Sequence, residues 1–395
     1  MSRHVSSRPG KIHGNIFWLS IATFLGDISN GLINVVLPIF LQNVLGLDKT
    51  FIGMVEGIAD FTAGILRIFF GWFSDRLGKR KVFVWIGYLL ASISRPLLGF
   101  ATSGISVLAL RFSDRFGAGI RLAPGDALIA DQSEAKQRGR SFGFNRTMDS
   151  LGYVAGPLLA FVILRFAPQG YRLVLWVTAI PAFLTMVVVT FYVRERSHPG
   201  TTSLSRLTLQ GLDPRFKYFV MIVVLFTLGN SSDAFLILRA QSLGISPAII
   251  PLWWALYNVV ATFLAFPAGI ISDRIGRFPM IIMGYLAFAV VYFGFAAANH
   301  PAVLWLLVLV YGIYKGMADG AQRTLATDLI PPDRRGSAFG VYYTSLSLAA
   351  LPSSVLAGLL WDTFGPPAPF YLGASLALIS TVLMVNLMRK SGNSL

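Results

Sequence analysis

Acidic residues fall inside long apolar stretches of this sequence, where an ionised carboxylate is costly. Eight of the 18 acids are placed this way: Asp27, Glu56, Asp60, Asp114, Asp126, Asp149, Asp233 and Asp319. An apolar surrounding favours the protonated form of a carboxyl group, whereas a neighbouring cation favours the ionised form. These residues therefore predict a protein that binds and releases protons within an apolar phase.

The sequence lacks the residues that several other kinds of chemistry require. The chain contains no cysteine, which excludes thiol catalysis and cysteine-based metal sites. Its four histidines lie in the expected tails or loops, so we expect no intramembrane histidine as a metal ligand or proton shuttle. No P-loop, G-x-S-x-G or H-E-x-x-H pattern occurs, and we therefore expect neither an enzyme, a bound metal nor a cofactor.

Two apolar stretches carry polar residues at helical spacing. Asp27, Asn30 and Asn34 occupy positions i, i+3 and i+7, which lie on one face of a helix. Asn230 and Asp233 show the same three-residue spacing in the second half of the chain. We expect these residues to contact a substrate or a proton.

Three further stretches combine cations with acids. Their charged residues are Arg111, Asp114, Arg115, Arg121 and Asp126; Arg146 and Asp149, beside Asn145; and Lys315, Asp319 and Arg323. The first set falls within an arc of about 140° on a helix. Six cations against four acids leave an excess of two, which is compatible with a cavity for an anionic or zwitterionic small organic compound but does not select it. Mutually neutralising structural pairs are the alternative interpretation.

Membrane-spanning helices must position these residues. The 395 residues are 55% hydrophobic and 13% charged, and their mean hydropathy is +0.65. Roughly 20 apolar residues suffice to cross the bilayer as a helix, and about 12 such runs occur. The expected spans are 15–42, 50–72, 82–101, 104–130, 141–167, 172–193, 216–240, 248–272, 279–298, 301–328, 337–361 and 368–388. The sequence therefore predicts an all-α membrane protein.

The basic residues are distributed unevenly between the two sides of these spans. The formal net charge is +15, and 21 of the 33 cations lie on the side that holds both termini, against 4 on the other. This asymmetry predicts that both termini lie in the cytoplasm. The expected location is the cytoplasmic (inner) membrane. Because the cations form short tracts between spans rather than one basic surface, nucleic-acid binding is not expected.

The chain repeats once. A segment from Gly71 through Asp75 and Arg76 to Gly78 and Lys79 reappears 198 residues later. The second copy comprises Gly269, Asp273, Arg274, Gly276 and Arg277. The repeat predicts two pseudo-symmetric six-helix bundles at 15–193 and 216–388, joined by a polar linker at 194–215. Cytoplasmic tails are expected at 1–14 and 389–395.

This architecture resembles the major facilitator superfamily over nearly all of residues 15–390. The most specific mark is the G-x-x-x-D-R-x-G-[RK]-[RK] signature, which ends in Lys79 and Arg80. The resemblance implies that this loop latches the two halves together in the outward-facing state. Asp75 and Arg76, with Lys79 or Arg80, would form the latch, and Asp126 or Asp131 would be its partner. Topogenic charge alone is the alternative.

Two further segments resemble family motifs with departures. Arg111 begins a segment similar to R-x-x-Q-G-x-G, but Asp114 and Arg115 replace the Gln and the Gly. In the family this Arg is implicated in proton coupling. A second segment resembles the motif of drug/proton antiporters through Gly143, Gly152, Gly156 and Pro157, although Ala160-Phe161 replaces its final Gly pair. Plain helix packing explains the same small residues.

The resulting hypothesis is a proton-coupled exporter that works by alternating access. Its expected partners are a small-molecule substrate and protons within a lipid bilayer, and we expect a monomer. The alternatives are proton symport for uptake of an organic anion, or a non-transporting membrane sensor on the same scaffold. Glu56, Asp60 and Arg67 are expected near a water-exposed helix end or an outer gate. Trp253, Trp254 and Tyr257 are expected in an interfacial aromatic belt.

Overall fold

The computed structural model describes residues 14–134, 137–195, 212–330 and 335–392, and within these ranges the chain is helical without any β-strand. The helices are α1 (Gly14–Asn43), α2 (Lys49–Leu77), α3 (Lys81–Leu97), η1 (Leu98–Phe100), α4 (Gly104–Gln132), α5 (Arg138–Phe166), α6 (Tyr171–Val177), α7 (Ala179–Phe191), α8 (Pro214–Gly229), α9 (Ala234–Ser242), α10 (Ile250–Ile275), α11 (Arg277–Ala297), α12 (Pro301–Asp328), α13 (Arg335–Phe364) and α14 (Ala368–Gly392). Side-chain caps fix several starts, such as Asp48 for α2 and Ser103 for α4.

The helices group into twelve segments when η1 is joined to α3 and the pairs α6–α7 and α8–α9 are each taken as one. In the described residues, nine are long and apolar enough to cross a membrane, and ten if the two parts of α10, bent by 46°, form one span. The pairs α6–α7 and α8–α9 each count as one broken span in this comparison. The remaining two helices, α2 and α4, do not reach the same apolar character because charged side chains interrupt them. Those charges belong to the candidate site.

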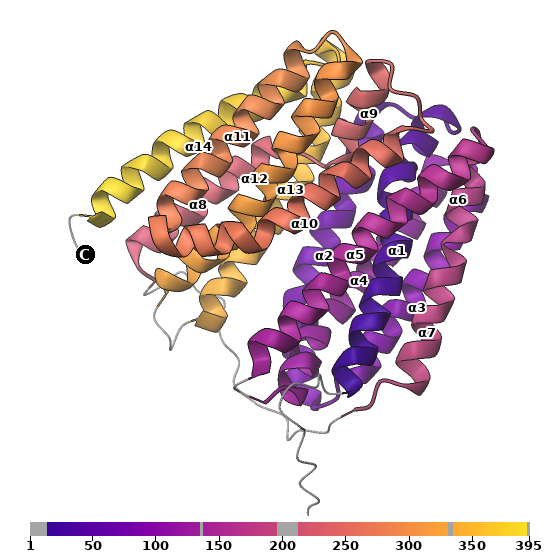
Figure 1. Cartoon of the computed structure of the whole chain (residues 1–395), viewed down its shortest axis with the longest axis horizontal. Coiled ribbons are helices and arrows are strands. Elements are labelled where there is room, and N and C mark those ends of the chain that lie inside the picture. The colour runs from indigo at the N-terminus through magenta and orange to yellow at the C-terminus, as the bar shows by residue number, and fades with distance from the viewer. Residues whose placement is uncertain (1–13, 135–136, 196–211, 331–334, 393–395) are drawn as a thin grey trace, which may run out of the picture.

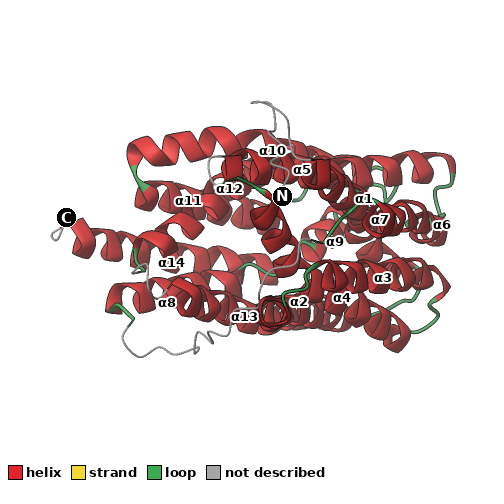
Figure 2. Cartoon of the chain, turned by 90° about the horizontal axis from the view of Figure 1, so that it is seen from below, coloured by secondary structure: helices red, strands yellow, loops and turns green. Residues whose placement is uncertain are grey.

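The helices form two bundles, α1–α7 and α8–α14, which meet along α2 and α13, α5 and α10, and α1 and α9. Figure 2 shows α2 beside α13 and α5 beside α10 along the junction. We call the end of the molecule where α1 begins and α14 ends the inner end, and the opposite end the outer end. The bundles separate toward the inner end (Figure 1).

Small residues bring the two bundles together on the outer side. A Cβ atom on Gly53 of α2 would lie 2.2 Å from the Ser354 carbonyl oxygen of α13. A Cβ atom on Gly358 of α13 would likewise lie 2.2 Å from the Lys49 carbonyl oxygen. Close backbone approach between membrane helices needs such residues. The bundles are therefore in close contact at the outer end, and their helices diverge toward the inner end, which we call the inward-open arrangement (Figure 1).

The aromatic belt expected at the start of α10 is wrong. Trp253, Trp254 and Tyr257 are all at least 95% buried. The Trp253 Nε1 donates to the Leu304 carbonyl oxygen at 3.0 Å, and the Tyr257 ring stacks on that of Tyr311 at 5.1 Å. Because α10 packs against α12 at this point, these rings belong to the core of the second bundle.

Candidate functional site

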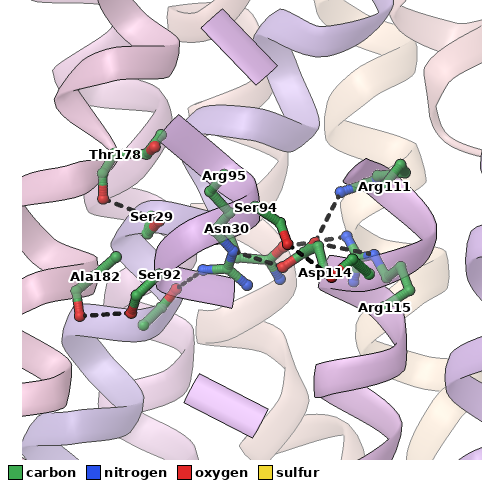
Figure 3. A network of polar contacts seen from close by, with 12 residues as sticks. Ser29, Asn30, Ser92, Ser94, Arg95, Arg111, Asp114, Arg115, Thr178 and Ala182 are labelled. Carbon is green, nitrogen blue, oxygen red and sulfur yellow. Dashed lines mark hydrogen bonds and ion pairs between the residues drawn. The ribbon is translucent and has the colours of Figure 1, made fainter. Parts of the chain in front are cut away.

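A buried carboxylate, Asp114 of α4, organises the polar centre of the first bundle (Figure 3). Its side chain is fully buried and accepts a hydrogen bond from Arg95 Nε of α3 at 2.8 Å. Arg111 Nη1 lies 3.4 Å from the same carboxylate, and Arg115 Nε lies 3.7 Å away. Glu56 of α2 supplies a second carboxylate, 3.0 Å from Arg111 Nη2. Each of the three arginines therefore has a carboxylate partner, and the three share two carboxylates.

The polar stripe of α1 completes this network. Arg111 and Arg115 both donate to the Asn34 Oδ1, at 3.2 and 3.0 Å. Arg115 also donates to the Asn30 Oδ1 at 3.1 Å, and the Asn30 Nδ2 donates to the Tyr153 hydroxyl at 2.6 Å. The structure thus brings together five residues that the sequence placed in the candidate site.

Arg95 did not emerge from the sequence as a candidate, and Glu56 was expected near a water-exposed helix end or an outer gate, not in this network. Arg95 was an isolated cation in an apolar stretch; it is 2% exposed, and its Nη1 donates to the Gly26 carbonyl oxygen at 2.8 Å. Glu56 is only 7% exposed. Gly53 and Gly57 on either side of it let α13 cover this part of α2. An unpaired cation in an apolar run was the only available signal.

Asp27 lies apart from the arginine network, between α1 and α5. Its side chain is 4% exposed, and its Cβ would lie 2.8 Å from a Cβ atom on Gly152. Asp149 lies three residues before Gly152 on α5, on the helix that packs against Asp27. It pairs with Arg146, whose side chain is largely exposed.

The corresponding residues of the second bundle lie where the α8–α9 span is broken. The Tyr311 hydroxyl donates to the Asp233 carboxylate at 2.7 Å, and the Asn230 Nδ2 donates to the Tyr314 hydroxyl at 3.4 Å. A cavity of 160 Å³ opens here, between the bundles. It is lined by Asp60, Asn230, Ser231, Ser232, Asp233, Tyr311, Lys315, Ala350 and Ser354. Non-helical backbone at membrane depth is tolerated where it lines such a cavity.

The charged ladder of α12 is only partly in this cavity. Lys315 lines it and pairs with Asp319 at 3.4 Å. Arg323 is exposed and does not line the cavity. The cavity therefore combines two acids from opposite bundles with one lysine that already has a carboxylate partner.

The loop between α2 and α3 is held within its own bundle. Arg80 pairs with Asp75, at 3.1 Å, and with Asp131 of α4. Gly78 caps α2 in a left-handed conformation with φ of 63°. Glu195 also contacts the loop, accepting from the backbone N–H of Arg80 at 3.1 Å. The Glu195 contact was not foreseen, because it joins residues 115 apart in sequence.

The other residues predicted for the latch take different positions. Asp126 pairs with Arg67 of α2 at 2.9 Å and does not contact the loop. The Arg76 guanidinium lies 5.7 Å from the Trp72 ring centroid, and Lys79 is exposed. Gly71 approaches the Ala123 side chain of α4.

The second copy of the loop also stays within its bundle. Asp273 pairs with Arg277, which lies 3.7 Å from Asp328 of α12. Arg274 is exposed, a Cβ atom on Gly269 would meet open space, and Gly276 has φ of 94°. In this conformation, the ion pairs between described residues of both loops hold a helix to its own bundle.

The glycines of α5 serve as contact points for α1. A Cβ atom on Gly156 would lie 2.6 Å from the Ile28 carbonyl oxygen, and the Pro157 ring lies 3.0 Å from the position of a Cβ on Gly31. A Cβ atom on Gly143, in contrast, would meet nothing within 4 Å. The spacing thus packs α5 tightly on α1 beside Asp27.

The model of the Major Facilitator Superfamily matches residues 19–238 and 218–393. The chain belongs to this superfamily. It is 34% identical over 378 residues to the uncharacterised MFS-type transporter MJ1317 of Methanocaldococcus jannaschii, which covers 94% of each chain. It is also 22% identical over 394 residues to the quinolone resistance protein NorA of Staphylococcus aureus, over 94% of this chain and 95% of NorA.

Solved structures show the same fold. The nucleoside transporter NupG superposes with a TM-score of 0.80 at 14% identity, over 94% of this chain and 99% of NupG. A bacterial homologue of the lysosomal transporter Spinster, in an inward-facing and occupied conformation, gives 0.73 at 18% identity, over 95% and 96%. This MFS protein is therefore an integral membrane transporter of a small-molecule substrate, and not an enzyme.

Proposed function

We propose that this MFS protein is a proton-coupled exporter, an antiporter that moves a small organic compound out across the cytoplasmic membrane. The observation that supports the proton coupling is the buried carboxyl group of Asp27, which is packed against Gly152 of α5. Asp27 is buried beside Gly152, and no described arginine forms an ion pair with it. A carboxyl group in this position can hold a proton in one conformation and lose it in the other.

The conformation suits one step of such a cycle. With both termini in the cytoplasm, as the distribution of basic residues predicts, the open inner end faces the cytoplasm. The substrate would enter from there, and a proton arriving from the outside would leave Asp27. The two bundles lie within one chain and form the cavity between them, so we propose that a monomer carries out the whole cycle.

For the substrate we propose a small zwitterion, within the class of anionic or zwitterionic compounds with which the sequence is compatible. Arg95, Arg111 and Arg115 each already have a carboxylate partner in Asp114 or Glu56, so none of them is free to bind a simple anion without giving up an ion pair. The cavity at the α8–α9 break instead presents both signs of charge, from Asp60, Asp233 and Lys315. The quinolones implied by the name of the relative NorA combine a carboxylate with an amine, and are a suitable first probe.

Reconstituted liposomes test this proposal. We expect an acid-outside or acid-inside pH gradient to drive a fluorescent quinolone in the direction opposite to the proton flux. Asp27→Asn should abolish the gradient-driven flux, because an amide does not exchange the proton. Asp213→Asn is the matched control, since Asn caps the start of α8 as well as Asp does. Quinolone flux that ignores the pH gradient in the unmodified protein would contradict the proton coupling.

A further inference from the structure

The outer end of α2 has a carboxylate cap that comes from the opposite bundle. The first N–H groups of a helix have no acceptor within the helix itself. The Asp48 side chain accepts from the Phe51 N–H of α2 at 2.6 Å, but it leaves the two preceding N–H groups unpaired. Asp362 of α13 accepts from these two, Lys49 at 3.2 Å and Thr50 at 2.7 Å.

The same carboxylate is also held by a side chain. The Thr50 hydroxyl donates to Asp362 at 2.7 Å, so three hydrogen bonds converge on one carboxylate across the bundle interface. A negative charge at a helix N-terminus is further favoured by the helix dipole. The contact therefore stabilises whichever conformation keeps the outer ends of α2 and α13 together.

The backbones of α13 and α2 also pack closely beside this contact. Gly358 lies one helical turn before Asp362, and a Cβ atom there would lie 2.2 Å from the Lys49 carbonyl oxygen and 2.6 Å from the Thr50 Cα. A separate hydrogen bond joins the bundles at the ends of α9 and α1, from the Gln241 Nε2 to the Asn43 Oδ1 at 2.8 Å. Opening the outer end must break both contacts.

We propose that Asp362 is an outer latch, a gating residue that holds the transporter in the conformation open at its inner end. In the opposite conformation α13 moves away from α2, and the two N–H groups pass to water. The Asp362 carboxylate is then released, so the latch contributes to one side of the alternating-access equilibrium only. This inference depends on alternating access, and it holds whether or not transport is coupled to protons.

Spin-label distances test the outer latch in lipid nanodiscs. Because the chain has no cysteine, labels can be placed on the unmodified sequence at exposed helix positions. The outer pair is Ile105 with Phe364, and the inner pair is Phe191 with Ile275, each joining the two bundles. We expect Asp362→Ala to raise the population with a long outer and a short inner distance by about fivefold, the ordinary effect of losing a helix cap. Asp362→Asn keeps one acceptor oxygen but loses the charge and the second acceptor, so it should raise the same population by a smaller factor.

Two further variants separate the latch from a general loosening. Gly358→Ala should produce the same shift with Asp362 intact, because its Cβ forces α13 away from α2. Thr363→Ala is the matched control, since its hydroxyl bonds only within α13, to the Leu359 carbonyl oxygen. Unchanged distances in both Asp362 variants would overturn the proposal. An equal shift in Thr363→Ala would also overturn it.

Discussion

Asp114 carries more of the electrostatic balance than any one of its arginine partners. Removing its charge leaves Arg111 paired with Glu56 and leaves Arg95 and Arg115 without an ion-pair partner among the described residues, whereas removing Arg95 leaves Asp114 two cations. Loss of one partner of a buried ion pair costs about 3–5 kcal/mol. We expect Asp114→Asn to approach this range and Arg95→Met to cost less, as measured by thermal unfolding in detergent. The reverse order would show that Asp114 is not the centre of the network.

Helical spacing in the sequence was enough to predict which residues of the arginine network share a helix face. Asn30, Asn34, Arg111 and Arg115 share faces of their own helices, and a charged face in a membrane must point inward. Which carboxylate meets which arginine was beyond the sequence, because Arg111 and Glu56 lie 55 residues apart on different helices. The roles of these residues in binding substrate or protons stay predictions.

Helix packing gives a test at the scale of elements. Gly156→Ala places a Cβ 2.6 Å from the Ile28 carbonyl oxygen and so forces α5 away from α1. We expect a lowered melting temperature together with weaker gradient-driven flux, because Asp27 is packed against Gly152 of α5 beside this contact. Gly143→Ala is the control, since its Cβ meets open space and Ala favours the helix by about 0.5–1 kcal/mol. Equal losses in both variants would contradict the packing argument.

The spans were predictable as elements, but their breaks were not. Apolar length identified 216–240 as one span, and the structure divides it into α8 and α9. The break falls at Asn230, Ser231, Ser232 and Asp233, whose side chains compete with helical backbone hydrogen bonds. Apolar length conceals such a break because the polar cluster is short. The sequence named Asn230 and Asp233, which line the cavity at this break. It did not predict the break or the shape of the cavity.

At the scale of the whole molecule, the repeat predicted two bundles but not their relative position. A latch loop in each bundle has the same sequence in every conformation, whereas its contacts change as the bundles move. In this structure Asp75 meets Arg80 of its own bundle, and Asp362 joins the bundles at the outer end. Only the three-dimensional structure shows which carboxylate pairs within its own bundle and which one joins the two bundles. The same helix pair, α2 and α13, thus offers a carboxylate near each end.

Opposite latches make a further prediction about the alternating-access equilibrium. The family resemblance implies that Asp75 latches the inner ends in the outward-facing state, so Asp75→Asn should lower the outward-open population. Asp362→Asn should raise it. Asp75 lies 25 residues beyond Thr50 on α2, about 37 Å along the helix, and distant substitutions have additive effects. We therefore expect the double variant to return the spin-label populations close to those of the unmodified protein. A double variant that stays as outward-open as Asp362→Asn alone would mean that Asp75 has no part in closing the inner end.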